Sequence, residues 1–158
     1  MGLDITAYKK LKVVENPQVD EDGDLVNWKT EWRPGESMKW SEENFPGRGE
    51  GVEADCVYTY EDSFGFRAGS YFGYGYWRDV LEEFKGDIAF QELINFTDNE
   101  GVIGPVVSKK LFEDFKKHEK EAESFAKTLE DGEFFIEKYK CWMKAFEYAL
   151  DDGAVDFH

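Results

Sequence analysis

The chain has 158 residues, a formal net charge of −16, and aromatic side chains at 17% of its positions. Its length is typical of one domain, and such a chain buries enough apolar surface to fold without a disulfide or a metal. The surplus of acids disfavours phosphate contacts, so we expect neither direct nucleic-acid binding nor an anionic membrane partner. We therefore expect a single domain over residues 1–158, whose charge suits a basic partner protein or serves solubility alone.

Cysteine usage is sparse and indicates a reducing compartment. Cys56 and Cys141 lie far apart, with no CxxC motif and no neighbouring histidine. We expect two buried free thiols, with a single disulfide as the alternative. The first residues contain no apolar signal-peptide core, and no apolar run is long enough to span a membrane. The sequence thus predicts a cytoplasmic protein.

The N-terminal third combines one strand with an acidic, irregular stretch. Apolar residues alternate along residues 3–14, which predicts a strand. Residues 15–55 carry 12 acids, 4 bases, three prolines and five glycines, so we expect hairpins and loops there. Turns are predicted at Asp22-Gly23 and Pro34-Gly35. Three tryptophans should pin this acidic stretch to the rest of the domain: Trp28, Trp32 and Trp40.

The middle of the chain is rich in glycine and aromatic residues. Residues 56–77 hold nine aromatics, interleaved with glycines. We expect a short strand over 57–60, then an irregular Gly-aromatic segment, and then a helix over 76–85 that ends at Gly86. Residues 88–96 are a short helix or a buried strand, and residues 97–101 are a turn.

Two amphipathic helices are predicted in the C-terminal third. The first runs over 108–129 with Ser108 as its N-cap, and the second runs over 134–150. The tail after Gly153 is apolar enough to dock back onto the domain. These elements predict an α+β fold, in which a small, mostly antiparallel sheet carries a C-terminal antiparallel helical hairpin. The buried contacts of the hairpin should involve Phe115, Phe125, Tyr139, Trp142 and Phe146.

The acidic run over residues 20–31 resembles part of a calcium-binding loop. Asp20, Asp22, Asp24 and Glu31 fall at positions 1, 3, 5 and 12 of an EF-hand pattern. Position 6, which requires glycine, is Leu25. We therefore expect an acidic turn with weak cation binding at most, and we predict no metal site and no cofactor.

The Gly-aromatic segment 64–78 is the candidate ligand site. Glycine allows close approach of the backbone to a ligand, aromatic rings offer stacking faces, and arginines offer forked donors to an anion. The alternative is a wall of core aromatics with glycines at the bends. The polar run over 95–101 either forms a turn or lies opposite the arginines. The tentative ligand set is Arg67, Tyr71, Tyr74, Tyr76, Trp77, Arg78, Asn95, Asp98 and Glu100.

No pattern of residues supports catalysis. His118 lies near the apolar stripe of the first C-terminal helix, where a partly exposed boundary position is expected, and His158 is terminal. Ser/His/Asp, HExxH and Cys/His motifs are all missing from the sequence. We therefore predict no catalytic residue and favour a function other than catalysis.

Six short stretches are dispersed along the chain: MGLDITAY (1–8), SFGFRAGSY (63–71), WR (77–78), ELINF (92–96), EGVIGPVVSKKL (100–111) and GAVDFH (153–158). Together they resemble a family of small uncharacterised proteins encoded by bacteriophages and prophages. The matching stretches are spread along the whole chain, and the acidic stretch 15–55 lies outside them. The resemblance implies a phage gene product that acts in the bacterial cytoplasm, in counter-defence or in phage–host control.

Two functions follow as hypotheses. The first is a binding protein without enzymatic activity that occupies a host protein with a basic surface; its extreme form is a DNA mimic, whose carboxylates are spaced like phosphates. The second is a protein that binds or sequesters a small, nucleotide-type anion through residues 64–78 and 95–100. Convergence of Arg67 and Arg78 on a cavity would favour the second hypothesis.

Overall fold

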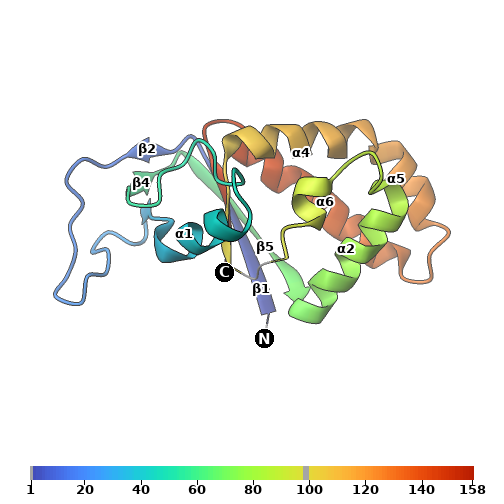
Figure 1. The fold of residues 1–158 in the computed structure, drawn as a ribbon, viewed down its shortest axis with the longest axis horizontal. Coiled ribbons are helices and arrows are strands. Elements are labelled where there is room, and N and C mark those ends of the chain that lie inside the picture. The colour runs from blue at the N-terminus through green and yellow to red at the C-terminus, as the bar shows by residue number, and fades with distance from the viewer. Residues whose placement is uncertain (1, 98–99) are drawn as a thin grey trace.

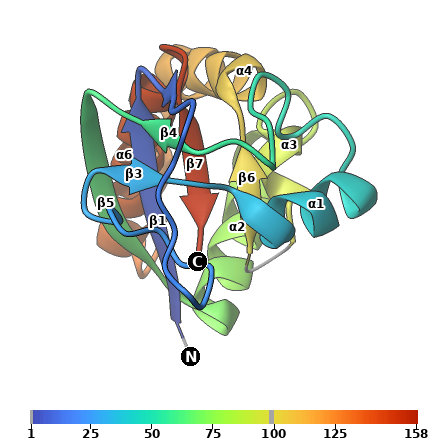
Figure 2. The same ribbon diagram turned by 90° about the vertical axis from the view of Figure 1, so that its left-hand side faces the viewer.

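The protein is described here by a computed structural model that covers residues 2–97 and 100–158. Its α+β class agrees with the sequence prediction. The central antiparallel sheet has four strands in the order β5-β1-β7-β6. Helices lie on one face of this sheet, and a smaller lobe covers part of the other (Figures 1 and 2). The strands are β1 (Gly2–Lys9), β5 (Asp62–Ser70), β6 (Gly101–Ile103) and β7 (Ala154–Phe157).

The predicted helical hairpin is present, but its first arm is broken. Helix α4 (Pro105–Lys117) and helix α6 (Gly132–Ala149) run in opposite directions against each other (Figure 1). The first arm ends at His118, and a separate helix α5 (Glu119–Ala126) follows it. Ser108 is not the N-cap, because Pro105 starts the helix and Gly104 precedes it. Proline is favoured in the first turn because its missing N–H would have no partner there.

The helix-facing side of the sheet forms the main hydrophobic core. Leu3 and Ile5 of β1 alternate with polar neighbours and are fully buried against the helices. Trp77 and Trp142 stack with ring centroids 6.1 Å apart. The expected hairpin contacts are all buried except Phe125, which is half-buried, and His118 is buried rather than at a boundary.

The Gly-aromatic segment forms regular structure where an irregular segment was expected. Residues 62–70 form β5, and helix α2 (Tyr71–Lys85) begins five residues earlier than predicted. The Ser70 hydroxyl accepts a hydrogen bond from the N–H of Gly73, which starts the helix. Aromatic side chains supply the packing that overrides the low helix propensity of the glycines at 73 and 75. Residues 88–96, for which a short helix and a buried strand were the alternatives, contain the short helix α3 (Gln91–Ile94).

The acidic stretch folds into the smaller lobe. The three-stranded sheet of the lobe has the order β2-β4-β3. Its strand β3 (Glu31–Trp32) comes from the acidic stretch, and the chain on either side of that stretch supplies β2 (Lys12–Val13) and β4 (Tyr58–Thr59). A helix that the sequence did not predict, α1 (Gly35–Asn44), follows Pro34 where a turn was expected. The second hydrophobic cluster holds the lobe on the sheet and is formed by Trp32, Met38, Val52, Tyr58, Val102 and Ala154.

The C-terminal tail docks as predicted and becomes the central strand β7, between β1 and β6. Cys56 and Cys141 are free thiols, but both are half-buried rather than buried. Over the described residues, no helix is long and apolar enough to cross a membrane.

Candidate functional site

The predicted ligand residue Arg67 lies on the exposed face of the sheet. Strand alternation turns its side chain away from the helices, and β1 places Asp4 directly opposite it. The guanidinium Nη1 lies 3.1 Å from Asp4 Oδ2, with 58% and 45% of the two side chains exposed. The aromatic residues next to Arg67 in the chain belong to the opposite face of β5. Arg67 forms an exposed ion pair.

Arg78 has a different environment and does not meet Arg67. Its guanidinium lies over the ring of Tyr74, 4.6 Å from the centroid, and Nη1 donates to the carbonyl of Ile94 at 2.8 Å. Tyr74 is buried and donates its hydroxyl to the carbonyl of Phe96. These contacts tie α2 to α3, so Arg78 holds two elements of the fold together.

The other predicted ligand residues are dispersed. Trp77 is 1% exposed and donates its indole N–H to the carbonyl of Phe135, which leaves no ring face for a ligand. Tyr71 and Tyr76 are exposed at the start of α2. Asn95 donates to the side chain of Gln91, Glu100 is exposed, and Asp98 lies outside the described residues. The proposed ligand role of this set stays a prediction.

The acidic run over residues 20–31 begins with a tight turn at residues 20–24. The Asp20 carboxylate accepts the backbone N–H groups of Asp22 and Asp24, each at 2.9 Å. Gly23 adopts φ +85°, which confirms the predicted turn. Glu31 belongs to β3. Over the described residues, no three His, Cys, Asp or Glu side chains are grouped so that they could hold a metal ion.

A polar row that the sequence did not predict lies on the face of the sheet that is turned away from the helices. We define this row as Asp4, Thr6, Arg67, Asp156 and His158. His158 Nε2 and Thr6 Oγ1 are 2.9 Å apart, and the indole N–H of Trp32 donates to Asp156 Oδ2 at 3.1 Å. To group these residues from the sequence, one would have had to combine the alternation of β1 with the prediction of a strand in the C-terminal tail. Within the row Asp4 pairs with Arg67 and Thr6 with His158, whereas Asp156 is held by Trp32 of the smaller lobe.

Asp156 is the electrostatically unusual member of the polar row. Burial raises its pKa to about 7, the Trp32 hydrogen bond opposes this effect, and the nearby charge of Glu100 adds to it. Burial also raises the pKa of the neighbouring Tyr8, with smaller contributions from Asp156 and Tyr60. The Tyr8 ring stacks on Trp32 at 4.8 Å. A carboxyl that titrates near neutral pH thus lies where the lobe meets the sheet.

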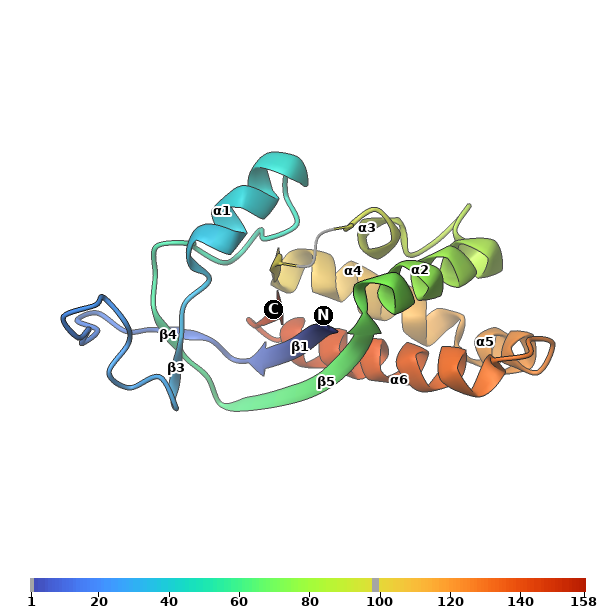
Figure 3. The same cartoon turned by 90° about the horizontal axis from the view of Figure 1, so that it is seen from below.

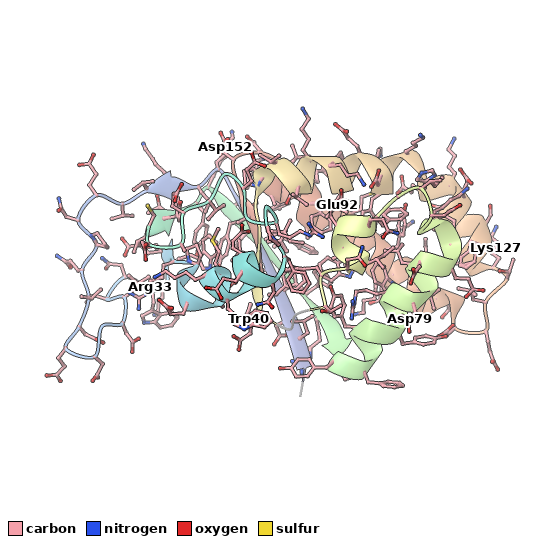
Figure 4. All side chains as sticks on the ribbon, in the orientation of Figure 1. Arg33, Trp40, Asp79, Glu92, Lys127 and Asp152 are labelled. Carbon is pink, nitrogen blue, oxygen red and sulfur yellow. The ribbon has the colours of Figure 1, made fainter. Side chains whose placement is uncertain are left out.

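The acidic lobe, residues 15–55, presents aromatic side chains to solvent. Trp32 pins the lobe as predicted, but Trp28 and Trp40 do not, because they are 67% and 49% exposed. Figure 4 shows Trp40 on α1, and Figure 1 shows the loop before β3 extending away from the rest of the molecule. The acidic lobe carries a net charge of −8, half of the total of −16. It is the candidate binding surface.

Comparison with known protein families, curated proteins and solved structures finds no match to this chain. The function must therefore be argued from the surface itself.

Proposed function

We propose that the protein is a binding protein without enzymatic activity, which occupies a basic surface of a partner protein through its acidic lobe. The observation that carries this proposal is that the acidic lobe holds both half of the net charge and the exposed rings of Trp28 and Trp40. Tryptophan is enriched among the residues that dominate binding energy, and it attracts Lys and Arg side chains through its ring face. Surrounding carboxylates steer a basic partner towards these rings.

The resemblance to phage-encoded proteins suggests the class of partner. A bacterial host protein with a basic nucleic-acid channel fits both the charge and the cytoplasmic setting, and occupying that channel would be an act of counter-defence. In its extreme form the acidic lobe would mimic DNA. Steering by exposed charges acts over about 8 Å at physiological ionic strength, so the complex should form quickly and weaken as salt is added.

Capture from a bacterial lysate at low and high salt tests the proposal. The lobe variant carries Glu21→Gln, Asp22→Asn, Asp24→Asn and Glu43→Gln, which spares the structural carboxylate of Asp20. The matched control removes the same number of exposed charges from the helices, by Glu82→Gln, Glu113→Gln, Glu137→Gln and Glu147→Gln. We expect a basic protein to be captured by the wild type and the control at low salt only.

The lobe variant, and separately Trp28→Ala combined with Trp40→Ala, should lose that protein. Equal capture by the lobe and control variants would contradict the proposal, since net charge alone would then explain binding. If added duplex DNA displaces the captured protein, its nucleic-acid channel is the occupied surface.

A further inference from the structure

Strand β5 forms an open edge of the central sheet. It is the first strand in the sheet order, and within the described chain it pairs with β1 on one side. Figures 2 and 3 show it as the outermost strand. Asp4, which faces Arg67, exchanges both of its backbone hydrogen bonds with His158 instead. By the alternation of an antiparallel ladder, Arg67, Gly65 and Ser63 therefore direct their backbone groups outward.

These outward groups are only loosely satisfied. The N–H of Ser63 donates to Asp62 Oδ1 at 2.8 Å, and the carbonyl of Arg67 accepts from Lys138 Nζ at 2.7 Å. Both partners are side chains, which the backbone groups of another strand can replace, and Asp62 keeps a second partner because its Oδ2 accepts the Tyr148 hydroxyl at 3.0 Å. The same alternation directs the N–H and C=O of Gly65 outward, and within the described residues neither group takes part in a turn, loop or cap hydrogen bond between backbone groups. An unpaired edge of this kind is a template for a further strand.

We propose that β5 docks against β5 of a second copy of this chain, antiparallel and about a two-fold axis at Gly65. The central sheets of the two copies then join into one continuous sheet. In this register Ser63 faces Arg67 of the second copy, and the pairing forms about six backbone hydrogen bonds. A two-fold contact requires a self-complementary surface, because the same residues meet on both sides.

The edge has this self-complementarity in its side chains. Phe64 faces Phe66 of the second copy as a cross-strand aromatic pair, and such pairs stabilise sheets. Phe64 is half-buried at present, with Lys144 Nζ 4.4 Å from its ring centroid. Asp62 and Lys138 are released from the backbone groups that become paired. The register brings Asp62 of each copy beside Lys138 of the other, so opposite charges meet at both ends.

The helices leave room for this joint sheet. Helix α6 packs mainly beneath β1, one strand in from the edge. Neighbouring strands are about 4.8 Å apart. Two copies of α6 would therefore run about 14 Å apart, beyond the 8–10 Å or so at which helices pack. The two copies of α6 therefore do not overlap when the edges join.

The overall charge opposes this dimer and supplies a test of it. Two copies that each carry −16 repel one another. Salt screens this repulsion, so raising the ionic strength from about 0.05 M to about 0.5 M should tighten the dimer. The acidic-lobe complex should respond to salt in the opposite direction. The two proposals can therefore fail independently.

Sedimentation equilibrium of the full chain across micromolar to millimolar concentrations measures the proposed dimer. Asp62→Lys and Lys138→Asp should each raise the dissociation constant about tenfold or more, because each places like charges together. Combining them restores opposite charges and should restore the dimer. Lys109→Asp, on an exposed position of α4, makes the same charge change as Lys138→Asp away from the edge. It should have little effect.

Gly65→Pro removes the central outward N–H at a place where an edge strand tolerates proline, and it should abolish the dimer. The charge variants keep the test decisive if the proline variant fails to fold. A chain that stays monomeric at millimolar concentration in high salt overturns the proposal. So does a dimer that persists in the single charge variants, which would use a different surface.

Discussion

Asp156 shows how one buried carboxyl links the fold to pH. Its pKa of about 7 in the folded protein is far above the value of about 3.9 expected for an unfolded aspartate. Between these values the folded state keeps a proton that the unfolded state has lost. The free energy of unfolding must therefore fall as pH rises through this window.

Asp156→Asn should remove this pH dependence. The amide oxygen still accepts the Trp32 N–H, and nothing at this position ionises. One pKa unit corresponds to about 1.4 kcal/mol. The free energy of unfolding of the wild type should therefore fall by roughly 2–4 kcal/mol between about pH 4 and pH 8, and that of the variant should not show this fall. Urea denaturation at several pH values measures both curves. Parallel curves would show that Asp156 does not titrate in this window.

The exposed position of Arg67 and its ion-pair partner could not be predicted from the neighbouring residues in the sequence. Its neighbours in the chain are aromatic and glycine residues, which placed Arg67 in a candidate ligand site rather than in an ion pair. Those aromatics pack on the helix side of β5, while Arg67 lies on the other face beside Asp4. Its partner is more than 60 residues away in the chain, and its face depends on the strand assignment. An exposed pair of this kind contributes little to stability, with about 0–1 kcal/mol being typical.

At the scale of elements, hydrophobic periodicity predicted the helices and the strand that bury one apolar face in the core. The α4–α6 pair and the first strand follow from their apolar spacing. Helix α1 was missed because it buries Met38 and Ser41 and little else, which leaves almost no apolar stripe to read. The break at His118 has no glycine or proline to mark it. There the backbone leaves the α-helical region, and the imidazole packs edge-on against the rings of Phe84 and Phe90.

Trp142→Ala tests the central role of α6. The Trp142 side chain is 1% exposed and touches the rings of residues from β5, α2 and β7. Removing it leaves a cavity that the surrounding elements cannot close, so the free energy of unfolding should fall by about 3–5 kcal/mol. Trp28→Ala is the matched control, because that ring is 67% exposed. Equal denaturation midpoints for the two variants would contradict this assignment of the core.

At the scale of the whole molecule, the two hydrophobic clusters divide the chain by their contacts. The main core joins β1, β5 and β7 to the helices, and the second cluster joins the acidic lobe to the opposite face of the sheet. Composition predicted the acidic stretch as a distinct region. The attachment of that region through Trp32, Tyr8 and Asp156 depends on pairing between distant parts of the chain, which no local pattern reveals.

Trp32→Ala should loosen the acidic lobe and leave the helical core closed. The ring stacks on Tyr8 at 4.8 Å and donates to Asp156, so its loss removes both a packing contact and a hydrogen bond between lobe and sheet. Local openings of this kind expose backbone amides without global unfolding. Amides of β2, β3 and β4 should exchange with deuterium about tenfold faster or more in the variant. Amides of α4 and α6 should exchange as in the wild type. A uniform increase over all elements would mean that the lobe and the helices unfold as one unit, and that Trp32 stabilises the whole domain rather than the attachment of its lobe.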